Sequence, residues 1–145
     1  MNKSSNALRP LALITGAAGG LGQATAKGLI ASGCDIVLAD INISSGEATR
    51  LALSEQFPEA QVSFVALDLS SLPAIEKFCE DFQVQHPHLD ILVNNAGLFP
   101  TLKRKANAQD CELGFSVGFY GHFALTAQLL PMLLAAPAPR VGCVA

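Results

Sequence analysis

The chain has 145 residues, of which 50% are hydrophobic and 14% charged, and its formal net charge is −3. This length allows one domain with a proper core but not two, and a mildly acidic chain whose one basic cluster is Lys103-Arg104-Lys105 argues against nucleic acid as a partner. No uninterrupted apolar stretch approaches the ~20 residues of a membrane span, and no long apolar segment precedes Thr15. We therefore expect neither a membrane partner nor a secretory signal.

Strand and helix patterns alternate along the chain almost without linkers. The helix expected between residues 44 and 57 opens with Ser44-Ser45-Gly46-Glu47, a capping-box pattern in which the serine caps and the glutamate reaches back. A long helix is expected from Ala108 to Ala135. The predicted strands cover residues 11–14, 36–39, 62–67, 91–93 and 141–145. Apolar strands separated by helices imply an α/β fold with a parallel sheet covered on both sides.

The four cysteines, Cys34, Cys79, Cys111 and Cys143, form no Cys-x-x-Cys pair and lie inside apolar segments. We expect buried, reduced thiols in a cytoplasmic protein, and neither a zinc site nor a disulfide framework. The three histidines have no spacing typical of a metal site. The sequence therefore predicts no metal.

Residues 11–22 read as an apolar strand, a glycine-rich turn and the start of a helix. Such a turn directs backbone N–H groups and the positive end of the helix dipole at one point, which suits the pyrophosphate of a dinucleotide. Asp40 ends the next apolar run, 18 residues beyond Gly22, where a carboxylate can accept hydrogen bonds from an adenosine ribose. A glycine turn alone could be an ordinary surface turn, but the combination favours a nucleotide site.

Three motifs in order resemble those of the short-chain dehydrogenases/reductases. Thr15-Gly16-Ala17-Ala18-Gly19-Gly20-Leu21-Gly22 resembles the family's TGxxxGxG loop, and Asn94-Asn95-Ala96-Gly97 resembles its NNAG motif. Asp68 lies where family members place an aspartate after the third strand, and residues 121–126 are similar to the fifth helix of members related to retinol dehydrogenases. The resemblance implies a Rossmann-type three-layer fold with the strand order 3-2-1-4-5, incomplete at its C-terminal side.

The resemblance also implies a cofactor site. In it, Asp68 would accept a hydrogen bond from the adenine amino group, Leu69 would offer its backbone N–H, and residues 95–97 would line the path from ribose to nicotinamide. The amide of Asn94 is expected to tie the central strands together instead. The implied cofactor-binding residues are Gly16, Gly19, Gly20, Leu21, Gly22, Asp40, Ile41, Asp68, Leu69, Asn95, Ala96 and Gly97.

The charge of Asp40 predicts NAD as the cofactor. It would lie where the 2′-phosphate of NADP must sit, and the neighbouring positions carry no Lys or Arg to offset the repulsion, being Ala17, Ala18, Ile41 and Asn42. The expected small-molecule partners are therefore NAD(H) and, only in a complete enzyme, an alcohol or carbonyl substrate.

The catalytic residues of the family have no match in this chain. The family uses a serine, a Tyr-x-x-x-Lys pair and usually an asparagine in the fifth helix, whereas Tyr120 is followed by Ala124 and the asparagine aligns with Gly118. Residues 140–145 resemble the strand that leads to the catalytic serine. We therefore assign no catalytic residue, expect residues 1–145 to be one NAD(P)-binding domain truncated before the catalytic Ser and Tyr-x-x-x-Lys, and expect no activity from the chain alone.

An alternative is a natural short protein that binds a nucleotide or a partner without catalysis, which Gly118 slightly favours. The last predicted strand would leave an unpaired edge, and the long helix carries much apolar surface, so we expect a homo-oligomer or an aggregation-prone chain. His122 is expected to be a packed helix residue and not a proton shuttle. The apolar helix residues behind the association prediction are Leu113, Val117, Leu125, Leu129, Met132 and Leu133.

Overall fold

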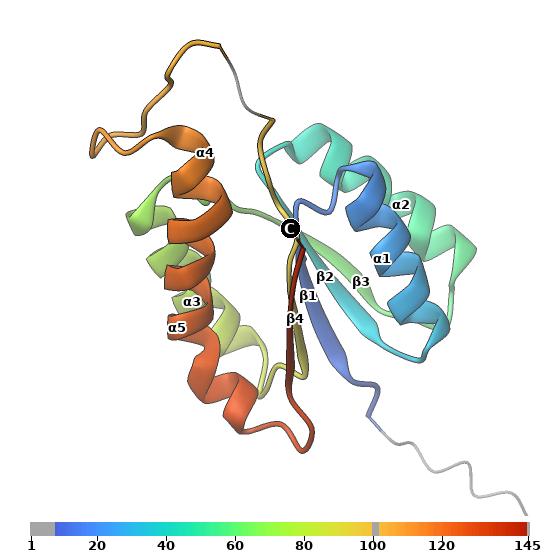
Figure 1. The fold of residues 1–145 in the computed structure, drawn as a ribbon. Helices are drawn as coiled ribbons and strands as arrows, with labels where there is room; N and C mark the ends of the chain where they lie inside the picture. Colours follow the sequence, from blue (N-terminus) through green and yellow to red (C-terminus); the bar gives the residue numbers. More distant parts are fainter. Residues whose placement is uncertain (1–7, 100–101, 145) are drawn as a thin grey trace, which may run out of the picture.

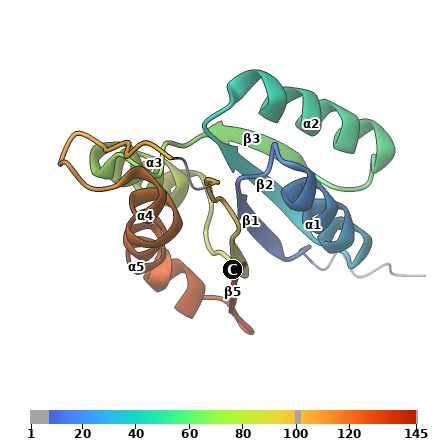
Figure 2. The same ribbon diagram turned by 45° about the horizontal axis from the view of Figure 1, so that its top comes forward.

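A five-stranded parallel sheet with the strand order β3-β2-β1-β4-β5 forms the centre of the computed structural model, which describes residues 8–99 and 102–144 (Figure 2). Each neighbouring pair of strands is parallel, so the order expected from the family resemblance is confirmed. The last predicted strand ends earlier than expected, and Ala145 lies outside the described residues. The strands are β1 (Leu11–Thr15), β2 (Asp35–Asp40), β3 (Val62–Ala66), β4 (Ile91–Asn94) and β5 (Arg140–Cys143).

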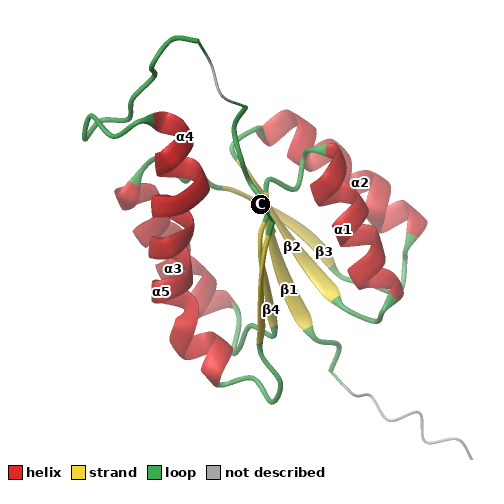
Figure 3. Ribbon diagram, viewed as in Figure 1, coloured by secondary structure: helices red, strands yellow, loops and turns green. Residues whose placement is uncertain are grey.

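Helices cover both faces of the sheet, which confirms the three-layer architecture (Figures 1 and 3). One face carries α1 (Gly20–Ala31) and α2 (Ile43–Gln56). The other carries α3 (Leu72–Gln85) and a continuous helical run made of α4 (Leu113–Phe115), η1 (Ser116–Gly121) and α5 (His122–Leu134). The middle part, η1, is π-helical, a form that is rare and frequently found at functional sites.

The core consists of two apolar clusters, one on each face of the sheet. Leu13 belongs to the cluster under α3 and α5, whereas Ala12 and Ile14 belong to the cluster under α1 and α2. Successive residues of a strand point to opposite faces, so a central strand with both faces covered becomes a continuous apolar run. On the α3 side, Ile75 and Phe82 are buried as the helical spacing predicts.

The start of α2 differs from the capping-box expectation. Asn42, and not a serine, is the N-cap, and its side-chain oxygen accepts a hydrogen bond from the Ser45 N–H at 3.0 Å. Glu47 does not reach back to the helix start but pairs with Arg50 at 2.7 Å. An asparagine caps a helix at least as well as a serine, so the earlier residue takes the position.

The long helical run begins at Leu113 and not at Ala108. Residues before it form a tight turn, because the Asn107 side-chain oxygen accepts the Cys111 N–H at 2.9 Å and Asp110 has a left-handed φ of 57°. Glu112 then caps the helix by accepting the N–H groups of the next turn, and these bonds lower the pKa of its carboxyl. Side-chain capping therefore sets the boundary, which hydrophobic periodicity does not reveal.

Burial of the long run also differs from expectation. Leu125, Leu129, Met132 and Leu133, which we expected to leave apolar surface exposed, are buried in the core. The stretch Leu113–Leu134 (22 residues) is long and apolar enough to cross a membrane, but the core helix of a globular fold can have the same length and composition. Here α5 packs against α3 and β4.

The cysteines are not all buried as predicted. Cys34 and Cys79 are buried, but Cys111 is half-buried and Cys143 is exposed. Burial raises the pKa of the Cys79 thiol to about 11. Cys143 is exposed because all of β5 lies open at the edge of the sheet.

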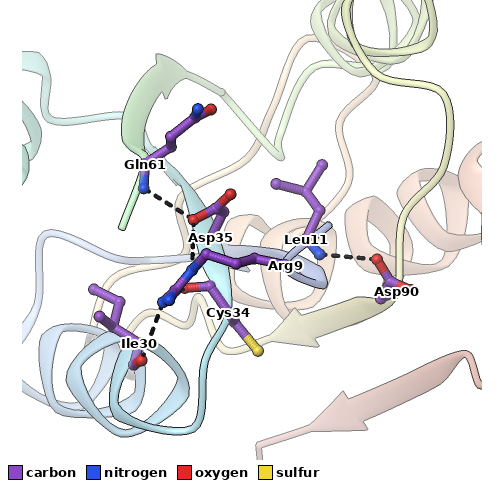
Figure 4. A network of polar contacts seen from close by, with 7 residues as sticks. All are labelled: Arg9, Leu11, Ile30, Cys34, Asp35, Gln61 and Asp90. Carbon is purple, nitrogen blue, oxygen red and sulfur yellow. Dashed lines mark hydrogen bonds and ion pairs between the residues drawn. The ribbon is translucent and has the colours of Figure 1, made fainter. Parts of the chain in front are cut away.

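Two aspartates connect the strands at their amino ends (Figure 4). Asp35 accepts the Arg9 Nε–H at 3.0 Å and the Gln61 N–H at 2.9 Å. Asp90, which is 8% exposed, accepts the Leu11 N–H at 2.8 Å. These carboxylates therefore satisfy backbone groups at the strand beginnings, on the edge opposite the strand ends that carry the predicted site.

Replacing Asp90 by alanine should lower the free energy of unfolding by about 1–3 kcal/mol, because the Leu11 N–H loses its acceptor. Asp81→Ala is the matched control, since its ion pair with Lys77 joins two exposed side chains, and its loss should lower the free energy of unfolding much less. Urea unfolding measures both. Equal losses in the two variants would contradict this account of the edge.

Candidate functional site

A cleft of about 750 Å³ lies at the carboxyl ends of the strands and brings all the expected cofactor-site residues together. They come from four segments: the glycine loop with the start of α1 (16–22), the end of β2 (40–41), the turn after β3 (68–69) and the turn after β4 (95–97). Ligands of open α/β sheets bind outside this edge. The cleft also includes residues that the sequence analysis did not select, among them Thr15, Ser70 and Val117.

Close backbone approach explains two of the loop glycines. Gly16 has a left-handed φ of 65°, and a Cβ built on it would lie 2.7 Å from the Ala96 Cα. A Cβ on Gly22 would collide with the Gly16 carbonyl oxygen. Any side chain at either position would push the glycine loop away from its neighbours.

The start of α1 places backbone N–H donors beside the cleft. Gly19 is the N-cap and makes no side-chain capping bond, and the first α-helical bond runs from the Gln23 N–H to the Gly19 carbonyl. The preceding N–H groups of the helix, in residues 20–22, therefore have no acceptor within the helix. Together with the helix dipole they form a site suited to an anion.

Asp40 is fixed at the rim by two backbone donors. Its Oδ2 accepts the Ala18 N–H and its Oδ1 accepts the Asn42 N–H, each at 2.9 Å. The carboxylate thus joins the end of β2 to the glycine loop, and these bonds hold its charge at the cleft. Ile41 beside it is 67% exposed.

The turn after β3 is held by side chains on both sides. Asp68 accepts the Ser70 N–H at 2.9 Å and the Ser70 hydroxyl at 2.6 Å. Asn107 donates to the Ser70 carbonyl at 3.1 Å and to the Ser116 hydroxyl at 2.9 Å. Asn107, which the sequence analysis did not single out, therefore connects this turn to η1.

Thr15 binds the turn after β4 to the end of β1. Its hydroxyl oxygen accepts the N–H groups of Asn95 and Ala96, each at 3.0 Å. The side-chain amide of Asn95 donates to the carbonyls of Thr15 at 2.9 Å and Gly16 at 3.3 Å. Asn95 therefore lines the cleft as expected, but its NH₂ group is engaged by the glycine loop.

Asn94 is a structural residue, although its contacts differ from those expected. Its NH₂ donates to the Thr126 hydroxyl at 3.1 Å and lies 3.9 Å from the Cys143 sulfur. The side chain thus joins β4 to α5 and to the outer strand β5, and not to the central strand β1. Among the described residues its Oδ1 has no hydrogen-bond partner.

The one position that aligns with a catalytic family residue, Gly118, lies in η1. Gly118, which stands in place of the family's asparagine, would meet no described atom within 4 Å if it carried a Cβ. Tyr120 is 48% exposed. His122, which follows η1, is buried, and its Nε2 lies 2.8 Å from the Thr15 hydroxyl.

Comparisons with known proteins agree with these motifs. Residues 10–144 match the family model described as short chain dehydrogenase. The WW domain-containing oxidoreductase of Drosophila melanogaster is 41% identical over 120 residues, which are 81% of this chain and 29% of that protein. Retinol dehydrogenase 14 of Homo sapiens is 36% identical over 142 residues, covering 89% of this chain and 42% of that protein.

Solved structures show the same fold. Levodione reductase has a TM-score of 0.80 and 27% identity, with 94% of this chain and 54% of that chain covered. The RhlG/NADP active-site complex of Pseudomonas aeruginosa has a TM-score of 0.78 and 27% identity, with 92% and 53% covered. The chain thus spans less than half the length of the two relatives and about half that of the two structures.

Gly16→Ala should lower the free energy of unfolding by about 2 kcal/mol or more, because the left-handed φ and the contact with Ala96 both oppose a side chain. Gly20→Ala is the control: its Cβ would meet nothing within 4 Å, and alanine favours a helix by ~0.5–1 kcal/mol over glycine. Chemical denaturation compares them. A Gly16→Ala chain as stable as Gly20→Ala would show that the close approach is unimportant.

Proposed function

Because this chain belongs to the short-chain dehydrogenase family, we propose that it binds NAD(H) in the cleft and forms the cofactor half of an oxidoreductase. The reaction would transfer hydride between NAD(H) and an alcohol or carbonyl. The observation that carries the proposal is the meeting of Asp40, the uncapped start of α1 and the turn after β4 around one cleft.

The residues present fit a dinucleotide. Gly16 and Gly22 leave a cradle that any Cβ would fill, and the N–H groups at the start of α1 are suited to the pyrophosphate. A cleft of about 750 Å³ lies within the usual range for cofactor sites, roughly 300–1,000 Å³. Asp68 and Leu69 would hold the adenine, and residues 95–97 would lie along the path to the nicotinamide.

Asp40 supports NAD over NADP. Its carboxylate is held by the N–H groups of Ala18 and Asn42, so it cannot easily turn away from a 2′-phosphate. Two like charges about 4 Å apart repel by roughly 1–4 kcal/mol. The adjacent residues Ala17 and Ile41 carry no positive charge to offset this.

When bound, the nicotinamide would supply or accept the hydride. The residues of this chain would bind and orient it, but the 145 residues contain no Tyr-x-x-x-Lys pair to move the accompanying proton. Gly118, with open space beside it, supports the alternative of a nucleotide-binding protein without catalysis.

The exposed apolar side of the long helical run supports a further partner, a second copy of the chain. Phe115, Phe119 and Phe123 are each more than half exposed, and the rings of Phe115 and Phe119 stack 5.1 Å apart. The four free thiols support the expected cytoplasmic location.

Calorimetric titration should show NAD⁺ binding at least about tenfold more tightly than NADP⁺. Asp40→Asn should narrow this ratio, because it removes the charge while keeping one acceptor oxygen. Glu55→Gln, an exposed charge removal on α2, should leave the ratio unchanged. Tighter binding of NADP⁺ to the unmodified chain would overturn the cofactor proposal.

Purified residues 1–145 should form no NADH from NAD⁺ and a panel of secondary alcohols, since general acid–base groups typically contribute ~10²–10⁴-fold. Gly118→Asn should not restore turnover, because the asparagine alone cannot transfer the proton. Steady NADH formation above that of a mock preparation, made in the same way from host cells without the chain, would count against this.

A further inference from the structure

His122 is a buried histidine that does not line the cleft. It is the first residue of α5 and is 6% exposed. Its Nε2 lies 2.8 Å from the Thr15 hydroxyl oxygen, and its Nδ1 lies 3.3 Å from the Gly118 carbonyl oxygen. The imidazole therefore connects η1 to the same hydroxyl that holds the turn after β4.

Counting protons at Thr15 fixes the form of the imidazole. A hydroxyl has one donor and two acceptor sites, and both acceptor sites are taken by the N–H groups of Asn95 and Ala96. The hydroxyl must therefore donate, either to His122 Nε2 at 2.8 Å or to the Val93 carbonyl at 3.4 Å. The shorter contact is the stronger bond, so Nε2 is the acceptor and Nδ1 carries the proton that it donates to Gly118.

We propose that His122 is a positioning residue for the dinucleotide site, acting as a neutral acceptor that turns the Thr15 hydroxyl so that its lone pairs hold the Asn95 and Ala96 N–H groups. This inference rests on the proposed cofactor function, because the turn it holds is part of the proposed site. In a protonated imidazole, Nε2 would also carry a proton and would direct it at the Thr15 oxygen. Both acceptor sites of that oxygen are already occupied by the Asn95 and Ala96 N–H groups. At least one bond to the turn would then be lost, and cofactor affinity would fall with it.

The surroundings favour the neutral imidazole. Burial lowers the pKa of His122 from its usual 6.5, and the hydrogen bond to the Gly118 carbonyl opposes this only in part. No charged side chain contributes to this shift. The segments that pack against α5 or its start are α3, η1, β4, β1 at Thr15 and the turn after β3. β1 and β4 carry no titratable residue, and the titratable groups on the others are Asp68, Glu76, Lys77, Cys79, Glu80, Asp81 and Tyr120.

The direction of the pH effect follows from the lowered pKa. Above pH 6.5 the imidazole is neutral in both the folded and the unfolded chain, and its contribution to stability and binding is complete. Between 6.5 and the lower folded pKa, the unfolded chain holds more protons, so stability falls as the pH falls. NAD⁺ binds the folded chain, so its affinity should stay constant from about pH 8 down to the folded pKa of His122, which lies below 6.5. Below that folded pKa the affinity should decrease by up to about tenfold per pH unit.

Two substitutions of His122 distinguish its role as a hydrogen-bond acceptor for Thr15 from the effect of its becoming charged. His122→Gln keeps an acceptor within reach of Thr15 and cannot titrate, so it should bind NAD⁺ within about threefold of the unmodified chain at pH 7.5 and lose the acid-side decrease. His122→Leu has no acceptor and should bind about tenfold more weakly at pH 7.5. His86→Gln is the control: burial also lowers the pKa of His86, but it caps α3 away from the cleft, so the acid-side decrease should persist.

A second readout needs no cofactor. The ¹⁵N chemical shifts of the imidazole nitrogens at pH 7 should show a neutral ring with the proton on Nδ1. A ring protonated on Nε2, a His122→Gln chain that keeps the acid-side decrease, or a His122→Leu chain with unchanged affinity would overturn the inference. If NAD⁺ binds at no pH, the proposed function fails, whereas the nitrogen shifts still decide the state of His122.

Discussion

The hydroxyl of Thr15 is the contact on which the cleft depends. It accepts the N–H groups of Asn95 and Ala96, and so keeps the turn after β4 against the glycine loop. Gly16 makes this approach possible, since a side chain there would strike Ala96. The Asn95 amide closes the same junction from the other side by donating to the glycine-loop carbonyls. Sequence-distant motifs are thus joined by a small set of hydrogen bonds.

The amino ends and the carboxyl ends of the strands have different roles. At the amino ends, the carboxylates of Asp35 and Asp90 accept hydrogen bonds from backbone N–H groups, and Asp35 also accepts one from Arg9 (Figure 4). These bonds stabilise the fold. At the carboxyl ends, donors at the start of α1 have no acceptor within the helix, and Asp40 holds a charge at the rim. Donors that the helix leaves without an acceptor, together with a fixed charge, are suited to binding a ligand. In a parallel sheet the carboxyl ends of all the strands lie on this same side.

Glycine turns and apolar runs are local patterns, so the sequence alone predicted a parallel α/β sheet and a nucleotide site at the glycine loop and Asp40. The strand order and the other members of the cleft followed from the resemblance to the short-chain dehydrogenases/reductases. The sequence did not predict which side chains hold the turns. Asn107 and His122 act across long sequence separations, and no spacing marks them. Helix starts were also missed, because Asn42 and Glu112 cap through side-chain bonds. In α1, Leu21 is exposed beside the cleft whereas Ile30 is buried.

Mapping of backbone amide shifts on addition of NAD⁺ tests the central claim most directly. The account predicts that the largest changes fall in the four cleft segments, residues 16–22, 40–41, 68–69 and 95–97. Amides at the opposite edge, beside Asp35 and Asp90, should change little. Changes confined to that opposite edge, or no change in the cleft at millimolar NAD⁺, would contradict it.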